Sequence, residues 1–168
     1  MKTSPADLVL TPTGLRAGER RLPCTIGRGG LRDASTKREG DGATPRGVHR
    51  IVGMLYRSDR IPRPAPWAVP IGPADLWSDD VADPDYNHRV RAPHPFSHER
   101  LRRADPMYDL VLVTDWNWPE AVAGKGSAIF VHQWRRPGWP TAGCVALSRP
   151  DLQWLAARIR PGARLIVR

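Results

Sequence analysis

Short apolar runs separated by glycine and proline recur along the whole chain, a pattern typical of β-strands joined by turns. Two brief runs near the start close at glycines, and a third follows the glycine-rich loop "GDGATPRG". Two later runs are more strongly apolar, which predicts strands at the centre of a sheet. The expected strands are "DLVLTPTG" (7–14), "LPCTIGRGG" (22–30), "VHRIVGMLY" (48–56), "MYDLVLVTDW" (107–116), "GSAIFVHQW" (126–134) and the final "ARLIVR" (163–168).

One amphipathic helix is predicted near the C-terminus. Ser148 and Asp151 form an S-x-x-D capping box, with Pro150 between them. Apolar residues then follow at helical spacing until Pro161 and Gly162 stop the helix. These apolar residues are Leu152, Leu155, Ala156 and Ile159.

Residues 58–106 differ from the rest because they are rich in Pro, Arg, Asp and Trp. They predict a long surface excursion of the kind that builds a binding wall. Within it, Ser97 can cap a short helix "HERLRR" with Glu99 in its first turn. His98 then either belongs to this helix or lines a binding site.

Composition narrows the class of protein. The 168 residues fit one domain, and the 18 Pro and 15 Gly are spread out, which favours a loop-rich globular fold. The 26 Lys and Arg against 17 Asp and Glu give a net charge of +9. This charge attracts any polyanion, so it does not distinguish nucleic acid, anionic lipid and acidic wall polymer as partners. No zinc spacing, phosphate-loop motif or membrane-length apolar run is present. "GDGATPRG" lacks the Gly-Lys-Ser/Thr ending of a phosphate loop and predicts a structural turn. The N-terminus does not resemble a secretory signal, so the chain is either cytoplasmic or exported by a route that the sequence does not show.

The two cysteines carry the candidate chemistry. Cys24 lies in a β-prone run and is interpreted as a small buried hydrophobe. A disulfide framework is not indicated, although one bridge stays open in an oxidising compartment. Cys144 follows Gly143 and lies twelve positions after His132. His132 directly follows the apolar run "AIFV". A cysteine nucleophile needs a base and amide donors for an oxyanion, and His132 with the N–H groups of Gly143 and Cys144 can supply them. The alternative is a core thiol near a surface imidazole.

These residues resemble the L,D-transpeptidase catalytic domain family (YkuD domain), in which a histidine precedes a Ser/Thr-x-Gly-Cys segment. His132 and "TAGCVAL" (141–147) carry the resemblance. It extends to "KREGDGATPRGVHRI", "DPDYNHRV", "SHERL", "MYDLVLV" and "GKGSAIFVH", and so covers roughly residues 25–167.

The resemblance implies a mainly β fold: a sandwich of mixed sheets with few helices. It also implies a peptidoglycan tetrapeptide stem as substrate, without cofactor or metal, and a location in the cell envelope. Cys144 would attack the L-centre carbonyl of diaminopimelate, expel D-Ala and form a thioester. His132 would act as base and then acid, and Thr141 would shape the turn. We expect a monomer without a membrane span or a nucleic-acid partner.

Several positions depart from the family pattern. Ala142 and Ala146 stand where His and Arg or Asn are common, and Gln133 stands where Gly often follows the histidine. The missing arginine is a plausible carboxylate binder, so Arg149, Arg135 and Arg136 become candidate replacements. Trp134 and Trp139 either cover the core edge or form pocket walls.

Two other functions stay open. A carboxypeptidase or amidase on the same fold differs from a transpeptidase only in whether water or an amine reaches the thioester. A non-catalytic module that binds wall polymer or nucleic acid would use the basic surface, but it would have no need of His132 and Cys144.

Overall fold

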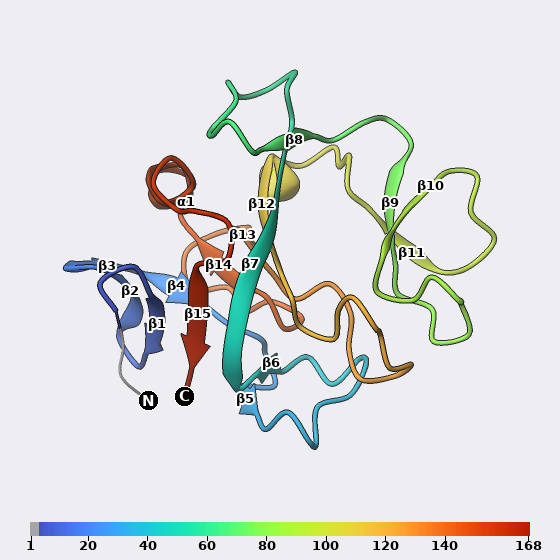
Figure 1. The fold of residues 1–168 in the computed structure, drawn as a ribbon, viewed down its shortest axis with the longest axis horizontal. Coiled ribbons are helices and arrows are strands. Elements are labelled where there is room, and N and C mark those ends of the chain that lie inside the picture. Colours follow the sequence, from blue (N-terminus) through green and yellow to red (C-terminus); the bar gives the residue numbers. More distant parts are fainter. Residues whose placement is uncertain (1–3) are drawn as a thin grey trace.

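The computed structural model describes residues 4–168, and these residues form short strands, one 3-10 helix and one α-helix (Figure 1). The sequence therefore predicts the class correctly: mainly strands in mixed sheets, with a single helix. The strands are β1 Leu8–Thr11, β2 Gly14–Ala17, β3 Arg20–Leu22, β4 Cys24–Thr25, β5 Leu31–Arg32, β6 Thr44–Pro45, β7 Gly47–Tyr56, β8 Val69–Pro70, β9 Asp75–Ser78, β10 Arg89–Arg91, β11 His98–Arg100, β12 Leu110–Thr114, β13 Phe130–Gln133, β14 Val145–Leu147 and β15 Arg164–Val167; the helices are η1 Pro106–Tyr108 and α1 Arg149–Ala156.

A 10-stranded sheet organises the molecule around the long strand β7. The first half of β7 pairs with β15, followed by β1, β2 and β3, and the second half pairs with β12, followed by β13, β14 and β4. The edge strands β3 and β4 are separated in sequence by Pro23 alone. The sheet must therefore roll round until its two edges come together.

The strand β12 explains why "LVLV" is apolar at every position. Leu110 and Leu112 face a first core, which the two halves of the sheet and α1 enclose. Val111 and Val113 face a second core on the other side of the sheet, under the excursion 58–106. Since successive side chains of a strand point to opposite faces, a strand buried on both faces needs an unbroken apolar run.

The excursion 58–106 contains more regular structure than its composition suggested. β10, β9 and β11 form a separate three-stranded sheet, visible on the right of Figure 1. The predicted helix "HERLRR" is wrong, because His98–Arg100 is the strand β11, paired antiparallel with β9. Ser97 consequently caps nothing. The long-range pairing with β9 outweighs the local capping preference.

The predicted C-terminal helix is confirmed as α1, although it ends at Ala156 and leaves Ile159 in the following turn. The Ser148 hydroxyl accepts a hydrogen bond from the backbone N–H of Asp151 and donates one to its carboxylate. Leu152, Leu155 and Ala156 are buried in the first core. Neither helix among residues 4–168 is long and apolar enough to cross a membrane.

The two serines allow a direct test of capping. Ser148→Ala should lower the free energy of unfolding by about 1 kcal/mol, because one helix N–H loses its partner. Ser97→Ala should leave it unchanged, because that hydroxyl is exposed and lies before a strand. Urea unfolding of both variants measures the difference. A larger loss for Ser97→Ala than for Ser148→Ala would contradict the structure.

Candidate active site

Cys144 ends a tight turn that leads directly into β14. The Thr141 hydroxyl accepts a hydrogen bond from the Gly143 N–H (3.0 Å) and donates one to the Cys144 carbonyl (2.7 Å). Gly143 has φ +141°, and a Cβ there would lie 2.9 Å from the Ala43 carbonyl oxygen. Both the backbone conformation and the close approach therefore require glycine at this position.

The loop "GDGATPRG" lies behind this turn, as a structural support. The Thr44 hydroxyl donates to the Gly143 carbonyl (2.7 Å) and accepts from the Gly27 N–H (2.9 Å). A Cβ at Gly27 would lie 2.2 Å from the Gly42 carbonyl oxygen, so the chain segments at 27, 42 and 143 are packed backbone against backbone. The cysteine turn is thus fixed from two sides.

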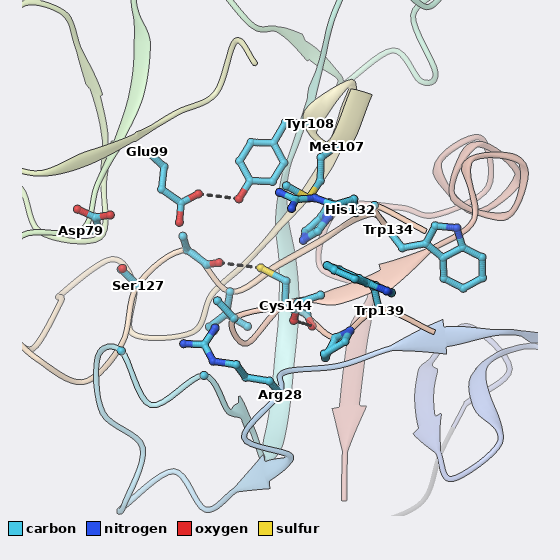
Figure 2. Close-up of a pocket in the computed structure, with 18 of the residues that line it drawn as sticks. Arg28, Asp79, Glu99, Met107, Tyr108, Ser127, His132, Trp134, Trp139 and Cys144 are labelled. Atoms are coloured by element: carbon cyan, nitrogen blue, oxygen red, sulfur yellow. Dashed lines mark hydrogen bonds between the residues drawn. The ribbon is translucent and has the colours of Figure 1, made fainter. Parts of the chain in front are cut away.

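Pairing of β13 with β14 places the candidate nucleophile and base on one face of the sheet. The strands are parallel, with Val131 opposite Val145 and His132 opposite Ala146. Val131 and Val145 point into the first core, so Cys144 and His132 point to the opposite face. There both line one pocket of about 430 Å³ (Figure 2).

His132 is held in the tautomer that a base requires. Its Nδ1 lies 2.7 Å from the Gln133 carbonyl oxygen, which can only accept, so Nδ1 carries the proton and Nε2 is left unprotonated. Burial lowers the pKa of His132 to about 4, because a charged imidazolium is poorly solvated there. The Tyr108 ring packs edge-on against the imidazole, with centroids 5.3 Å apart.

Cys144 is a neutral thiol in this arrangement. Its Sγ donates to the Ala128 carbonyl oxygen (3.1 Å) and accepts from the Phe130 N–H (3.4 Å). Burial raises the pKa of the thiol to about 12. The thiol proton is therefore directed at Ala128, and a base must remove it before the sulfur can react as a nucleophile.

The pocket walls carry both signs of charge. Asp79 and Glu99 lie on one side in Figure 2, where the Tyr108 hydroxyl donates to the Glu99 carboxylate (2.6 Å) and burial raises the pKa of Glu99. Arg28 and Arg135 also line the pocket. Neither arginine has an ion-pair partner among the described residues. A cavity with this mixture suits a ligand that carries both ammonium and carboxylate groups.

Some of the predicted binding residues reach this pocket and others do not. Trp134, Arg135 and Trp139 line it, with Thr141 and His132. Arg136 instead stacks on the ring of Trp139, 3.7 Å from its centroid. Trp139 is 44% exposed, so it forms a rim of the pocket and does not cover the core.

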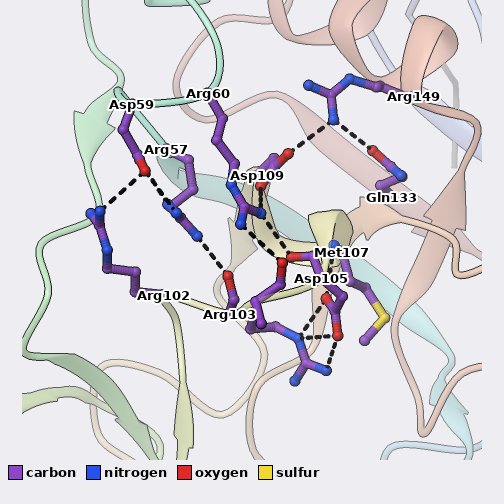
Figure 3. A network of polar contacts seen from close by, with 11 residues as sticks. Arg57, Asp59, Arg60, Arg102, Arg103, Asp105, Met107, Asp109, Gln133 and Arg149 are labelled. Atoms are coloured by element: carbon purple, nitrogen blue, oxygen red, sulfur yellow. Dashed lines mark hydrogen bonds and ion pairs between the residues drawn. The ribbon is translucent and has the colours of Figure 1, made fainter.

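Arg149 and His98 lie outside the residues that line the pocket. Arg149 donates to the Asp109 carboxylate (2.9 Å), which also binds Arg60 (2.9 Å), within the polar network of Figure 3. His98 lines a smaller hollow of about 200 Å³ with Arg100 and Arg102. Arg149 is thus ion-paired with Asp109, and His98 lies in the three-stranded sheet, so neither lines the pocket of Cys144.

Sequence reasoning missed most of the polar wall. Arg28, Lys37, Asp79, Glu99 and Tyr108 come from separate segments, and only the folded sheet brings them to one pocket. Lys37 is buried and pairs with Asp41 (2.8 Å), so it supports the loop. The "SHERL" segment predicts a helix turn for Glu99, whereas the structure places Glu99 in β11, at the pocket wall. The alternation of a strand would have been the signal that pointed its carboxylate inward.

Both cysteines are free thiols. Cys24 packs against the first core, as a small hydrophobe would, although it is partly exposed, and burial raises its pKa to about 11. Within residues 4–168, no group of three or more His, Cys, Asp or Glu side chains is arranged to hold a metal ion.

Comparison with known proteins gives one family match. The model of the L,D-transpeptidase catalytic domain (YkuD) matches residues 10–167. Among solved structures, an L,D-transpeptidase from Mycobacterium smegmatis is similar at 16% sequence identity and a TM-score of 0.40, over 89% of this chain and 48% of that chain. This chain thus spans about half the length of that protein. Among curated proteins, none matches the chain.

The buried, neutral His132 predicts a specific pH dependence of stability. Its pKa is about 4 in the folded state and near 6.5 when unfolded, so the unfolded chain binds the extra proton first as pH falls. This histidine should remove up to about 3 kcal/mol of stability between pH 6.5 and pH 4. Urea unfolding at several pH values should show a shallower loss for His132→Gln than for the unaltered protein. Equal slopes would mean that His132 titrates normally in the folded state.

Proposed function

This chain belongs to the L,D-transpeptidase catalytic domain family, and from that premise we propose that it is a cysteine acyltransferase acting on the peptide stems of peptidoglycan. The observation that carries the proposal is the placement of Cys144 and His132 on one face of paired strands, in one pocket, with Nε2 of His132 free to accept a proton. A module that only binds polymer would have no need of this pair, whose members are both buried.

The acylation step uses the thiol and imidazole together. Nε2 of His132 takes the Cys144 proton, and the sulfur attacks the L-centre carbonyl of diaminopimelate in a tetrapeptide stem. The C–N bond to D-Ala then breaks, the imidazolium returns its proton to the leaving amine, and a thioester remains on Cys144. The low pKa of His132 suits this exchange, because the imidazolium is a strong acid once formed.

The sequence predicts the backbone N–H groups of Gly143 and Cys144 as donors to the oxyanion. The Gly143 N–H donates to the Thr141 hydroxyl, so it is already engaged. The N–H of Cys144 is therefore the first candidate for stabilising the oxyanion, and Gly143 could join it only by releasing Thr141. In this proposal, Thr141 fixes the turn that presents the N–H groups of Gly143 and Cys144.

Substrate recognition follows from the charges of the pocket. A diaminopimelate stem carries carboxylates and an ammonium group near the scissile bond. Arg28 and Arg135 are placed to bind carboxylates, whereas Asp79 and Glu99 offer a negative wall to the ammonium. Oδ1 of Asp79 is buried without a hydrogen-bond partner among the described residues, which leaves it available to such a group.

The fate of the thioester distinguishes a transpeptidase from a hydrolase. A second stem's amine gives a cross-link, whereas water gives a tripeptide. Incubation with purified tetrapeptide, with and without an acceptor amine, separates the two by mass spectrometry of the products. We propose the amine as acceptor and the cell envelope as the site of action, since peptidoglycan lies there.

Cys144→Ala should abolish release of D-Ala from the tetrapeptide, because Cys144 is the one thiol of the described residues that lines the pocket. Cys24→Ala is the matched control and should retain turnover, since Cys24 packs against the first core and does not line the pocket. Quantifying free D-Ala over time measures both. Turnover that survives in Cys144→Ala and disappears in Cys24→Ala would refute the assignment.

Arg135→Ala should lower kcat/KM by about 10- to 100-fold, equivalent to losing roughly 1.5–3 kcal/mol of charge-assisted hydrogen bonding to a stem carboxylate. Arg136→Ala is the control, because that guanidinium stacks on Trp139 and does not line the pocket. Initial rates on soluble tetrapeptide at physiological salt measure both. If Arg135→Ala leaves kcat/KM unchanged, Arg28 becomes the carboxylate binder to alter next.

A further inference from the structure

The Cys144 sulfur is contacted by two backbone groups of one short segment. The thiol donates to the Ala128 carbonyl, and the Phe130 N–H donates to the sulfur; Figure 2 marks the bond made by Cys144 with a dashed line. A carbonyl oxygen can only accept a hydrogen bond, so it stabilises the protonated thiol and repels a thiolate. The Ala128 carbonyl therefore acts together with burial to keep the proton on the sulfur.

That peptide is held in an unusual conformation. Ala128 has φ +51°, a left-handed geometry that is costly for alanine because of its Cβ. A backbone of this kind persists only where its surroundings hold it. The Ala128 N–H donates to Oδ1 of Asn87 at 2.9 Å, which fixes the orientation of the segment from the second core.

Asn87 is buried, at 2% exposure, and all four of its side-chain hydrogen bonds are made. Oδ1 also accepts from the indole N–H of Trp77 (3.0 Å), and Nδ2 donates to two carbonyls, those of Trp116 (3.0 Å) and Asn117 (2.7 Å). The Trp77 ring packs edge-on against Phe130, with centroids 4.9 Å apart. Asn87 thus fixes the Ala128 peptide directly and the Phe130 residue through Trp77.

We propose that Asn87 is a positioning residue that holds the Ala128 carbonyl against Cys144, so that the resting thiol stays protonated and turned away from His132. The proposal rests on Cys144 being the nucleophile of the proposed function. Turning the S–H from Ala128 to Nε2 of His132 moves one proton from sulfur to nitrogen and requires no other reactant. A thiol held in this way is poorly reactive toward oxidants and alkylating agents until that turn occurs.

The charged and titratable groups that face Cys144 come from four elements. Glu99 from β11 raises the pKa of the thiol and Lys37 from the 37–42 loop lowers it, while Tyr108 of η1 and His132 of β13 line the same pocket. A substitution at position 87 alters none of these groups. A change in the alkylation rate of Cys144 would therefore show how firmly the Ala128 peptide is held.

Alkylation of the free protein by iodoacetamide between pH 7 and pH 10 tests the proposal, with adducts at each cysteine quantified by mass spectrometry. Asn87→Gly removes the amide and leaves a residue that tolerates the φ of +60° found there. Cys144 in this variant should react about tenfold faster at pH 8, corresponding to a pKa lower by about one unit. Its rate should stay about tenfold higher at every pH from 7 to 10, because the pKa of the thiol lies above this range in both proteins.

Asn117→Gly is the matched control. Asn117 also has a positive φ, of 51°, but its side chain hydrogen-bonds Val122 and Gly126, with no hydrogen bond to Ala128 among the described residues. Its Cys144 rate should stay within about twofold of the original, a change well below one pKa unit. Cys24 is the internal reference and should react equally in all three proteins.

A folded Asn87→Gly protein whose Cys144 reacts at the original rate throughout pH 7 to pH 10 would overturn the proposal. An equal acceleration of Cys24 would also overturn it, because that indicates general loosening. If Asn87→Gly does not fold, Trp77→Phe takes its place: it keeps an aromatic ring beside Phe130, removes the indole N–H that orients Oδ1 of Asn87 (3.0 Å), and should shift the rate in the same direction. Alkylation needs no stem peptide, so a protein that is inactive on tetrapeptide but shows this acceleration refutes the proposed function alone.

Discussion

The parallel pairing of β13 with β14 is the constraint on which the site depends. Opposite residues of this pair share a face, so the register of Val131 with Val145 sets the positions of His132 and of Cys144, which precedes Val145. A shift of one residue would turn the sulfur into the first core and the valines into the pocket. Burial of both faces makes such a shift costly, because the first core would have to accept the imidazole.

The same pairing explains why the candidate catalytic residues also belong to the packed core. Phe130, Cys144 and Tyr108 belong to the second core, yet each also contacts or lines the reacting groups. The excursion 58–106 covers this core with Trp77 and Leu101 and supplies Asp79 and Glu99 to the pocket. It is therefore a structural lid over the second core and a wall of the pocket at once.

How much the sequence could predict varies between elements. "LVLV" and the start of the helix at 149–156 were predictable because their signals are local: an apolar run and a capping box. The end of the helix was not, because it stops at Ala156, before the Pro-Gly pair. "SHERL" was not, because β11 exists only through its pairing with β9, twenty residues away in the chain. Residue type and resemblance single out Cys144 and His132 as candidates, and the fold brings both to one pocket. Arg28, Asp79 and Asn87 were not, since their importance comes from contacts between distant segments, and the ion pair of Arg149 with Asp109 could likewise only be seen in the fold.

The meeting of β3 with β4 across Pro23 joins the N-terminal hairpin to the turn at 141–144. The residues just after Pro23 pair with β14, and two backbone hydrogen bonds then tie Ile26 and Arg28 to Thr141. One short stretch of chain thus closes the sheet and supports the turn that carries Cys144. The first strands contribute no side chain to the pocket, yet they are mechanically part of the candidate site, and a disturbance of the seam between them and β4 would reach Cys144 through backbone alone.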